Sequence, residues 1–231
     1  MTTWASGPLL GFDTETTGVN STSDRVVTAA LVMRDAAGTR QRTWLIDPGV
    51  EIPAGAAAIH GITTEKARAE GLAPAPALDE IAGMLVQALR NGIPVVAFNA
   101  GFDLQILDSE LARHHLPTLP QRLGGPVRPV IDPLVIDRAV DRYRKGKRTL
   151  GHLCQVYGIT GSGLHTAEVD VVATLDVLRA IVSRHSAKLA HLDLHGLHDY
   201  QVAAHRAWAE SFREWLVSKG RTDGPGSEWP Y

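Results

Sequence analysis

The sequence predicts an α/β fold, in which a mixed five-stranded sheet carries helices on both faces. Residues 8–15, 25–33 and 41–46 are apolar or β-branched segments joined by short links, which is typical of an antiparallel meander. Residues 93–98 form a continuous apolar run after a helical pattern, as expected for a buried parallel strand. Strand-like and helical segments then alternate, which indicates that helices cover both faces of the sheet.

Helices are predicted where apolar residues recur every three or four positions. Residues 79–90 show this spacing, and Asn91 and Gly92 end the segment as a C-terminal cap would. A short helix after Thr63 or Thr64 is predicted from their capping side chains. The further predicted helices cover residues 102–114, 133–143, 150–157, 166–184 and 197–219.

The other segments are predicted to connect these elements. Residues 73–77 are interpreted as a Pro/Ala linker, and residues 117–129, rich in Pro and Gly, as a loop. Residues 130–132 are the candidate fifth strand. We expect one α/β domain at 1–190, and a helical appendage with a mobile tail at 191–231.

Composition bounds the class of protein. With 231 residues, 44% hydrophobic and 21% charged, the chain is typical of soluble globular proteins. The net charge of −2 excludes a global basic field, so nucleic-acid binding must rest on local patches or metal ions. A single cysteine, Cys154, and the lack of a signal peptide or of a run of ~20 apolar residues lead us to expect a cytoplasmic protein.

Two acidic residues end the first predicted strand. Asp13 and Glu15 are spaced i, i+2, so they share one face of the strand, together with the small residue Gly11. Two carboxylates on one face repel each other unless a cation lies between them, and hard divalent ions are the natural partners. An exposed acidic strand end is the alternative, and this stretch alone does not decide between them.

Two further acidic clusters stand where helices begin. Asp103 follows the buried strand and lies in the first turn of the next helix, where the helix dipole keeps a carboxylate ionised. Asp170 occupies a similar place after the candidate N-cap Thr166, and His165 precedes that helix on a Gly-containing loop. Taken singly, each cluster is explained as well by dipole compensation or by a surface histidine.

The joint order of these motifs is specific. GFDTETTG at 11–18, NAGFD at 99–103 and H-x4-D at 165–170 together resemble the three-motif pattern of the DEDDh 3′→5′ exonucleases, the family of the proofreading epsilon subunit of bacterial DNA polymerase III. The resemblance extends to HGIT at 60–63 and to the segment DPLVID at 132–137. It implies a ribonuclease-H-like fold and two-metal hydrolysis of a 3′-terminal phosphodiester.

The resemblance also implies a role for each residue. Asp13 would bridge two Mg²⁺ or Mn²⁺ ions, Glu15 and Asp170 would bind one ion, and Asp103 would hold the second. His165 would be the general base that accepts a proton from the attacking water. The residues expected beside the 3′ nucleotide are Thr16, Thr17, His60, Asn99 and Phe102.

The substrate and partners stay open at this point. We expect a single-stranded DNA 3′ end, with short RNA or RNA 3′ ends and a non-catalytic partner module as the alternatives. A DNA polymerase subunit and a stand-alone repair enzyme are equally compatible with the sequence, and a homodimer is a further candidate.

Two other patterns are interpreted without a catalytic role. Residues 138–148 contain six basic residues, which fit phosphate binding or a solvated helix end equally well. Trp208, Phe212 and Trp215 fall on one helical face, for which core packing or a homodimer contact is favoured over nucleic-acid stacking.

Overall fold

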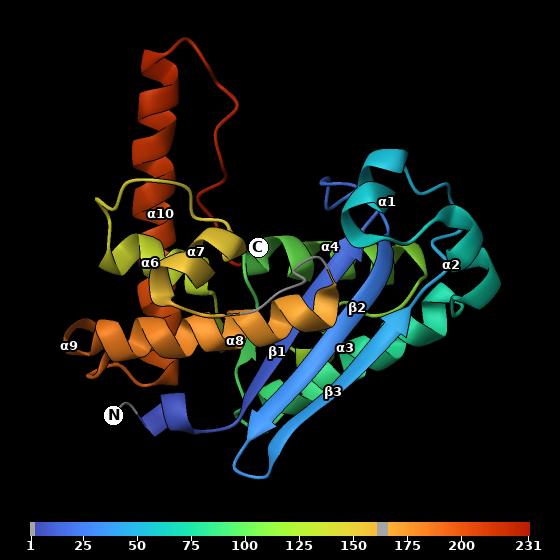
Figure 1. Ribbon diagram of the computed structural model, residues 1–231, viewed down its shortest axis with the longest axis horizontal. Helices are drawn as coiled ribbons and strands as arrows, with labels where there is room; N and C mark the ends of the chain where they lie inside the picture. The colour runs from blue at the N-terminus through green and yellow to red at the C-terminus, as the bar shows by residue number, and fades with distance from the viewer. Residues whose placement is uncertain (1–2, 161–165) are drawn as a thin grey trace.

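A five-stranded mixed sheet forms the centre of the computed structural model, which describes residues 3–160 and 166–231 (Figure 1). The strand order is β3–β2–β1–β4–β5. β1 pairs antiparallel with β2 and parallel with β4, as the sequence predicts. The strands are β1 (Leu9–Thr16), β2 (Val26–Asp35), β3 (Gly38–Leu45), β4 (Val95–Val96) and β5 (Val130–Ile131).

Helices occupy most of the remaining described chain. The first group is η1 (Thr3–Ser6), α1 (Ala54–His60), α2 (Thr64–Glu70), α3 (Pro74–Arg90), α4 (Ala100–Arg113) and α5 (Leu119–Leu123). The second group is α6 (Pro133–Val140), α7 (Leu150–Tyr157), α8 (Ala167–Arg184), α9 (Ser186–Leu189) and α10 (Leu194–Ser218). In the described ranges, no helix combines the length and the apolar character that crossing a bilayer requires.

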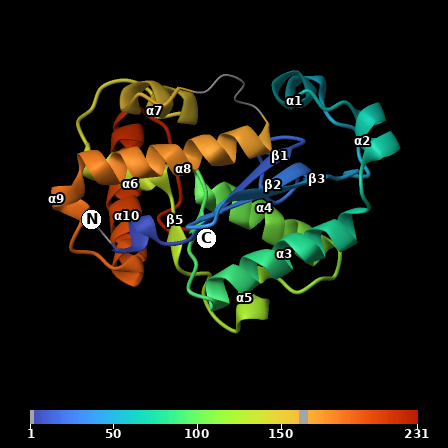
Figure 2. The same cartoon turned by 60° about the horizontal axis from the view of Figure 1, so that its bottom comes forward.

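The sheet separates two hydrophobic cores (Figure 2). Leu10 and Phe12 of β1 belong to the core with α3 and α4, whereas Leu9 belongs to the core with α7 and α8. Because side chains alternate along a strand, Asp13 and Glu15 share the α8 face with Leu9, and Thr14 points to the α4 face. The two acidic residues therefore end β1 on the side that α8 covers.

β1 and α8 approach each other closely at Gly11. A Cβ atom placed on Gly11 would lie 2.3 Å from Cγ1 of Val171 and 3.3 Å from Cδ1 of Leu175. A glycine leaves the space that these two side chains fill. This contact holds the first turns of α8, including Asp170, against the end of β1.

The first half of α10 lies along β5, and side chains make the hydrogen bonds between them. The backbone N–H of Val130 donates to His198 Nδ1 at 3.2 Å, and Gln201 Nε2 donates to the Val130 carbonyl at 3.0 Å. The Asp132 N–H donates to Gln201 Oε1 at 2.6 Å. The second half of α10 projects beyond the rest of the protein (Figure 1).

The segment after α10 turns back towards α4 (Figure 1). Trp229 is 7% exposed, and its ring lies 5.2 Å from that of His198. Tyr231 is partly buried against the core on the α4 side. Apolar side chains of this tail thus contact the rest of the protein, while the mobility of the tail and the division of the chain at residue 190 stay predictions.

Three segments differ from the elements predicted for them. α3 begins at Pro74, inside the predicted linker, because proline is well tolerated in the first turn of a helix. α5 lies within the predicted loop, where Thr118 and Gln121 form a capping box. α1 was not predicted, since its sequence AGAAAIH carries little apolar periodicity.

Candidate active site

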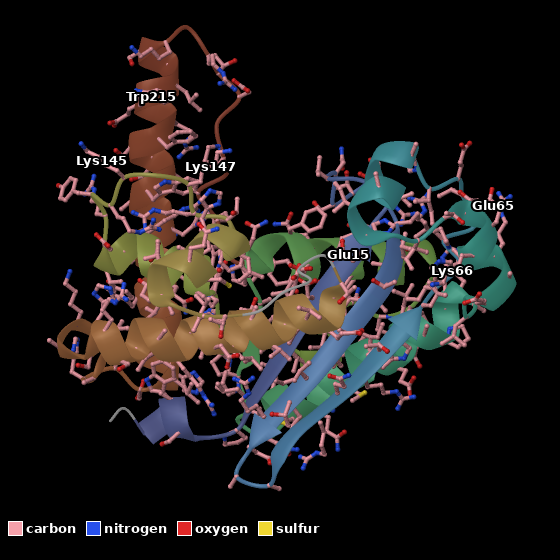
Figure 3. All side chains as sticks on the ribbon, viewed as in Figure 1. Glu15, Glu65, Lys66, Lys145, Lys147 and Trp215 are labelled. Atoms are coloured by element: carbon pink, nitrogen blue, oxygen red, sulfur yellow. The ribbon has the colours of Figure 1, made fainter. Side chains whose placement is uncertain are left out.

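Three carboxylates meet at the carboxyl end of β1. Asp13 and Glu15 come from β1 and Asp170 from the first turn of α8, and one ligand oxygen of each lies within 4.8 Å of the others. Figure 3 shows Glu15 at the end of β1, close to the start of α8. Sites of α/β sheets form beyond the carboxyl ends of strands, and β1 is where the sheet turns from antiparallel to parallel pairing.

The electrostatics of this cluster favour a cation. Burial raises the pKa of Asp13 well above its usual range, and the charges of Asp103, Asp170 and Glu15 raise it further. Burial and the charge of Asp170 raise the pKa of Glu15 to about 7. Each carboxylate therefore disfavours ionisation of its neighbours, and a divalent cation would relieve this repulsion.

Asp103 lies beside this cluster and is held by hydrogen bonds from Thr14, whose side chain points to the other face of β1. Its Oδ1 accepts hydrogen bonds from the backbone N–H of Thr14 at 3.0 Å and from Thr14 Oγ1 at 2.7 Å. Burial raises the pKa of Asp103 to about 7, while the two Thr14 hydrogen bonds oppose that rise. The structure thus brings Asp103 close enough to affect Asp13, but Asp103 is not one of the three mutually close ligands.

Thr14 and Asp132 support the site. Thr14 was not singled out in the sequence, and Asp132 was noted only as the start of the segment DPLVID, without a role. Asp132 is 1% exposed and accepts hydrogen bonds from the backbone N–H groups of Asn99 and Ala100 at 3.1 and 3.0 Å. Asn99 has φ 64°, a left-handed conformation that asparagine tolerates. Asp132 therefore fixes the start of α4, which carries Asp103. The signals that were available are strand alternation for Thr14 and the Asp-Pro pair at 132–133.

Thr16, Thr17 and His60 lie near Glu15, and their role beside a 3′ nucleotide stays a prediction. Thr16 Oγ1 donates to the Gly18 carbonyl at 2.6 Å, and Thr17 Oγ1 donates to Asp24 Oδ1 at 3.0 Å, so both residues shape the turn after β1. His60 lines a cavity of about 320 Å³ together with Glu15. Burial lowers the pKa of His60, and its Nε2 has no hydrogen-bond partner among the described residues.

Asn99 and Phe102 line a second cavity, of about 380 Å³. Asp132 and Arg138 also line it, as do residues 225–226 and 228–231 of the tail. Phe102 is half-buried and also packs against the core, so it takes part in both the core and the cavity wall. Of the five residues predicted beside a nucleotide, His60 thus lines one cavity and Asn99 and Phe102 line the other, whereas Thr16 and Thr17 line neither.

His165 lies outside the described residues, and its role as a general base stays a prediction. Thr166 does occupy the N-cap position of α8, although its side chain makes no capping hydrogen bond. Asp170 follows in the first turns of the helix, where the positive end of the helix dipole favours a carboxylate.

Asp137 organises the packing behind α7. It is fully buried, accepts a hydrogen bond from the Tyr157 hydroxyl at 2.8 Å, and pairs with Arg144 at 2.9 Å. Arg148 forms a further ion pair with the same carboxylate. The contacts of Asp137 are thus structural, because neither Asp137 nor its partners Arg148 and Tyr157 belong to the carboxylate cluster.

Comparison with known proteins supports a nuclease. The RNase_T family model, described as exonuclease, matches residues 10–178. The chain is 28% identical over 182 residues to the DNA polymerase III subunit epsilon of Treponema pallidum, covering 78% of this chain and 79% of that protein. It is 35% identical over 172 residues to a DNA polymerase III subunit epsilon-like protein of Rhodobacter capsulatus, covering 71% of this chain and 22% of that one.

A solved structure shares the fold. The complex of Escherichia coli exonuclease I with single-stranded DNA, in a zinc-bound form, superposes with a TM-score of 0.68 at 22% identity. The match covers 87% of this chain but only 43% of exonuclease I, so this chain corresponds to less than half of that protein. The likeness confirms the ribonuclease-H-like α/β architecture that the sequence predicts.

Proposed function

The chain belongs to the exonuclease family, and we propose that it is a metal-dependent 3′→5′ exonuclease acting on single-stranded DNA. The observation that carries the proposal is the meeting of Asp13, Glu15 and Asp170 within 4.8 Å. Membership of an exonuclease family and likeness to polymerase epsilon subunits support the same chemistry. The products would be a nucleoside 5′-monophosphate and a strand shortened by one nucleotide.

The donor set fits a hard divalent cation. Carboxylate oxygens are the ligands that Mg²⁺ and Mn²⁺ take in proteins. Burial and the neighbouring carboxylates raise the pKa values of Asp13 and Glu15, and a bound cation would counteract both effects. Asp13, Glu15 and Asp170 would hold one ion, and Asp13 with Asp103 a second. Bound there, the cations would offset the charge of the phosphate and of the transition state.

The residues of the chain then supply position and proton transfer. In hydrolysis, a water oxygen attacks the phosphorus, and the 3′ oxygen of the preceding nucleotide leaves and takes up a proton. We propose that His165 accepts the proton of the attacking water, because an imidazole titrates near neutral pH. Asn99 and Phe102 on one side, and Thr16 and His60 on the other, would position the terminal nucleotide.

We propose the cellular role of this protein from the names of its relatives. Two of them are named as a subunit epsilon of DNA polymerase III or as similar to one, which supports work in DNA replication or repair, beside a polymerase or alone. Because RNA is distinguished by its 2′-hydroxyl, and no described feature reads that group, an RNA 3′ end is retained as the alternative substrate.

A degradation assay tests the proposal. A 5′-labelled single strand should give a ladder of shortening products with Mg²⁺ or Mn²⁺, and EDTA should abolish it. A phosphorothioate at the 3′-terminal linkage should slow the reaction, whereas one at the 5′ end should not. An RNA strand of the same sequence, assayed in parallel, assigns the sugar preference.

A pair of carboxylate variants gives the control. Asp13→Asn should lose activity and weaken Mn²⁺ binding in calorimetry without loss of stability, since it relieves repulsion among buried carboxylates. Glu65→Gln removes an exposed carboxylate on α2 and should retain both properties. Full activity in the Asp13→Asn variant would refute the assignment of the site.

A further inference from the structure

We propose that the projecting half of α10 and the α6–α7 connection form a track for single-stranded nucleic acid, which binds the strand upstream of its 3′ end. The inference rests on the proposed function, because it extends the substrate path from that site. The track is defined by Trp208, Phe212 and Trp215 of α10, and by Arg142, Lys145 and Lys147 of the connection (Figure 3).

The aromatic side chains form a stacked ladder along α10. The rings of Trp208 and Phe212 lie 5.6 Å apart at 10°, and those of Phe212 and Trp215 lie 5.5 Å apart at 18°. Phe212 is 37% exposed and Trp215 52% exposed, so core packing does not explain them. Flat, exposed rings in a row offer the surface on which successive bases stack without sequence preference.

The surroundings of this ladder are basic. A cleft of about 770 Å³ between α10 and the α6–α7 connection is lined by three arginines and four aromatic residues, with no acidic residue among its described lining. Arg142, Lys145 and Lys147 are exposed and make no ion pair within the described ranges, in contrast to Arg144 and Arg148, which pair with Asp137. Unpaired cations beside exposed rings match the phosphates and bases of a single strand.

Arg138 connects this cleft with the catalytic region. Its guanidinium lies 3.9 Å from the ring centroid of Trp208, and the same residue lines the cavity formed by Asn99 and Phe102. A strand whose last nucleotide reaches Asn99 and Phe102 can therefore pass Arg138 and continue along Trp208 towards Trp215. The basic and aromatic residues thus lie along one path that leads away from the carboxylates.

A second copy of the chain fits this surface less well. In a two-fold symmetric contact the same patch meets itself, so the connection with Arg142, Lys145 and Lys147 would approach another connection of equal charge. Like charges facing each other oppose such a contact, whereas a polyanion is attracted. The charge on the surface therefore favours a nucleic acid over a homodimer.

Binding without catalysis tests the track. The anisotropy of a labelled oligothymidylate of ~16 nucleotides is followed in EDTA, at several salt concentrations. Trp215→Ala should raise Kd at least about fivefold, because stacking of one base is lost. Val217→Ala, an exposed change on another face of the same turn, is the control.

The charge contribution is tested separately on the exposed connection, where packing is not disturbed. Lys145→Gln/Lys147→Gln should reduce the slope of log K against log salt by about 1.4, the loss of two phosphate contacts. Arg40→Gln/Arg42→Gln on β3 removes the same net charge far from α10 and should leave the slope as in the parent protein.

Activity on two substrates separates this inference from the proposed function. In the track variants, the ratio of kcat/KM for the long strand over that for the p-nitrophenyl ester of thymidine 5′-monophosphate should fall at least about fivefold, since only the long strand reaches α10. Equal Kd values for Trp215→Ala and Val217→Ala, with an unchanged salt slope in the lysine variant, would overturn the track. So would a shift from dimer to monomer in sedimentation that accounts for the affinity loss. Track-dependent binding without hydrolysis of either substrate would support the track and refute the exonuclease.

Discussion

Gly11→Ala should damage the catalytic site through packing alone. The added methyl carbon would lie 2.3 Å from Cγ1 of Val171, whereas carbon atoms pack at ~3.5 Å or more, so α8 must retreat from β1 by about 1 Å. Val171 is β-branched and has little rotamer freedom in a helix, so it cannot turn away. Asp170 precedes it directly and would move with the helix.

The consequences are measurable in both stability and activity. Overpacking of this kind costs about 1–3 kcal/mol, at roughly 2–4 °C of Tm per kcal/mol for a chain of this size. Mg²⁺ requires ligand distances of about 2.0–2.1 Å, so a displaced Asp170 should weaken calorimetric Mn²⁺ binding. A misplacement near 1 Å lowers kcat/KM on the order of 100-fold.

A control variant and a compensating variant test whether the contact with Val171 causes these losses. Gly83→Ala on α3 adds a methyl group with nothing within 4 Å, and should leave activity unchanged. Val171→Ala, introduced into Gly11→Ala, removes the colliding atom and should restore part of both losses, with a coupling energy of about 0.5 kcal/mol or more. A Gly11→Ala protein with parental Tm, Mn²⁺ affinity and kcat/KM would refute the reasoning.

Three further outcomes are expected. The metal-free protein should lose stability as the pH rises from about 4 towards 7, because the raised pKa values of Glu15 and Asp103 make the folded state bind more protons than the unfolded chain in this range. Measuring Tm against pH checks this. Mg²⁺ should raise Tm more at about pH 8 than at about pH 5. Asp137→Asn leaves Arg144 and Arg148 without their buried partner. It should lower the free energy of unfolding in urea by about 3 kcal/mol, with no effect on Mn²⁺ affinity. A decrease below about 0.5 kcal/mol, as for an ordinary surface substitution, would contradict this expectation. Gln201→Leu leaves the Asp132 N–H and the Val130 carbonyl unpaired and should cost about 1–3 kcal/mol for each, with faster amide exchange at Asp132 than in a Gln87→Leu control on α3.

Periodicity and capping predicted most of the fold. The five strands, and the helix at Leu150–Tyr157, lie where the sequence places them, and Thr63 caps α2 by accepting a hydrogen bond from Lys66. These elements carry strong local signals: β-branched runs, apolar spacing, and a capping side chain. β4 is shorter than its apolar segment, Val95–Val96 only, because apolar character marks burial and not strand pairing.

The sequence singled out the acidic residues that the structure groups, but not the contacts that hold them in place. The motif order indicates Asp13, Glu15, Asp103 and Asp170, and the structure gathers three of them with Asp103 beside Asp13. The hydrogen bonds from Thr14 to Asp103, and from Asn99 to Asp132, join positions 89 and 33 residues apart. Local patterns contain no information about such distant pairs. The exposure of Trp215 was missed for a related reason: helical periodicity shows that three aromatic residues share a face, but not that nothing covers it.

The way in which α10 lies along β5 limits how this protein associates with others. With its carbonyl and N–H groups already bonded to Gln201 and His198, β5 offers no free ladder to an incoming strand. At the opposite margin, β3 exposes Arg40 and Arg42, and charged residues there oppose the addition of a foreign strand. Growth of the sheet from one molecule into the next is thus hindered at both sides, and a protein partner would have to dock on helices or loops.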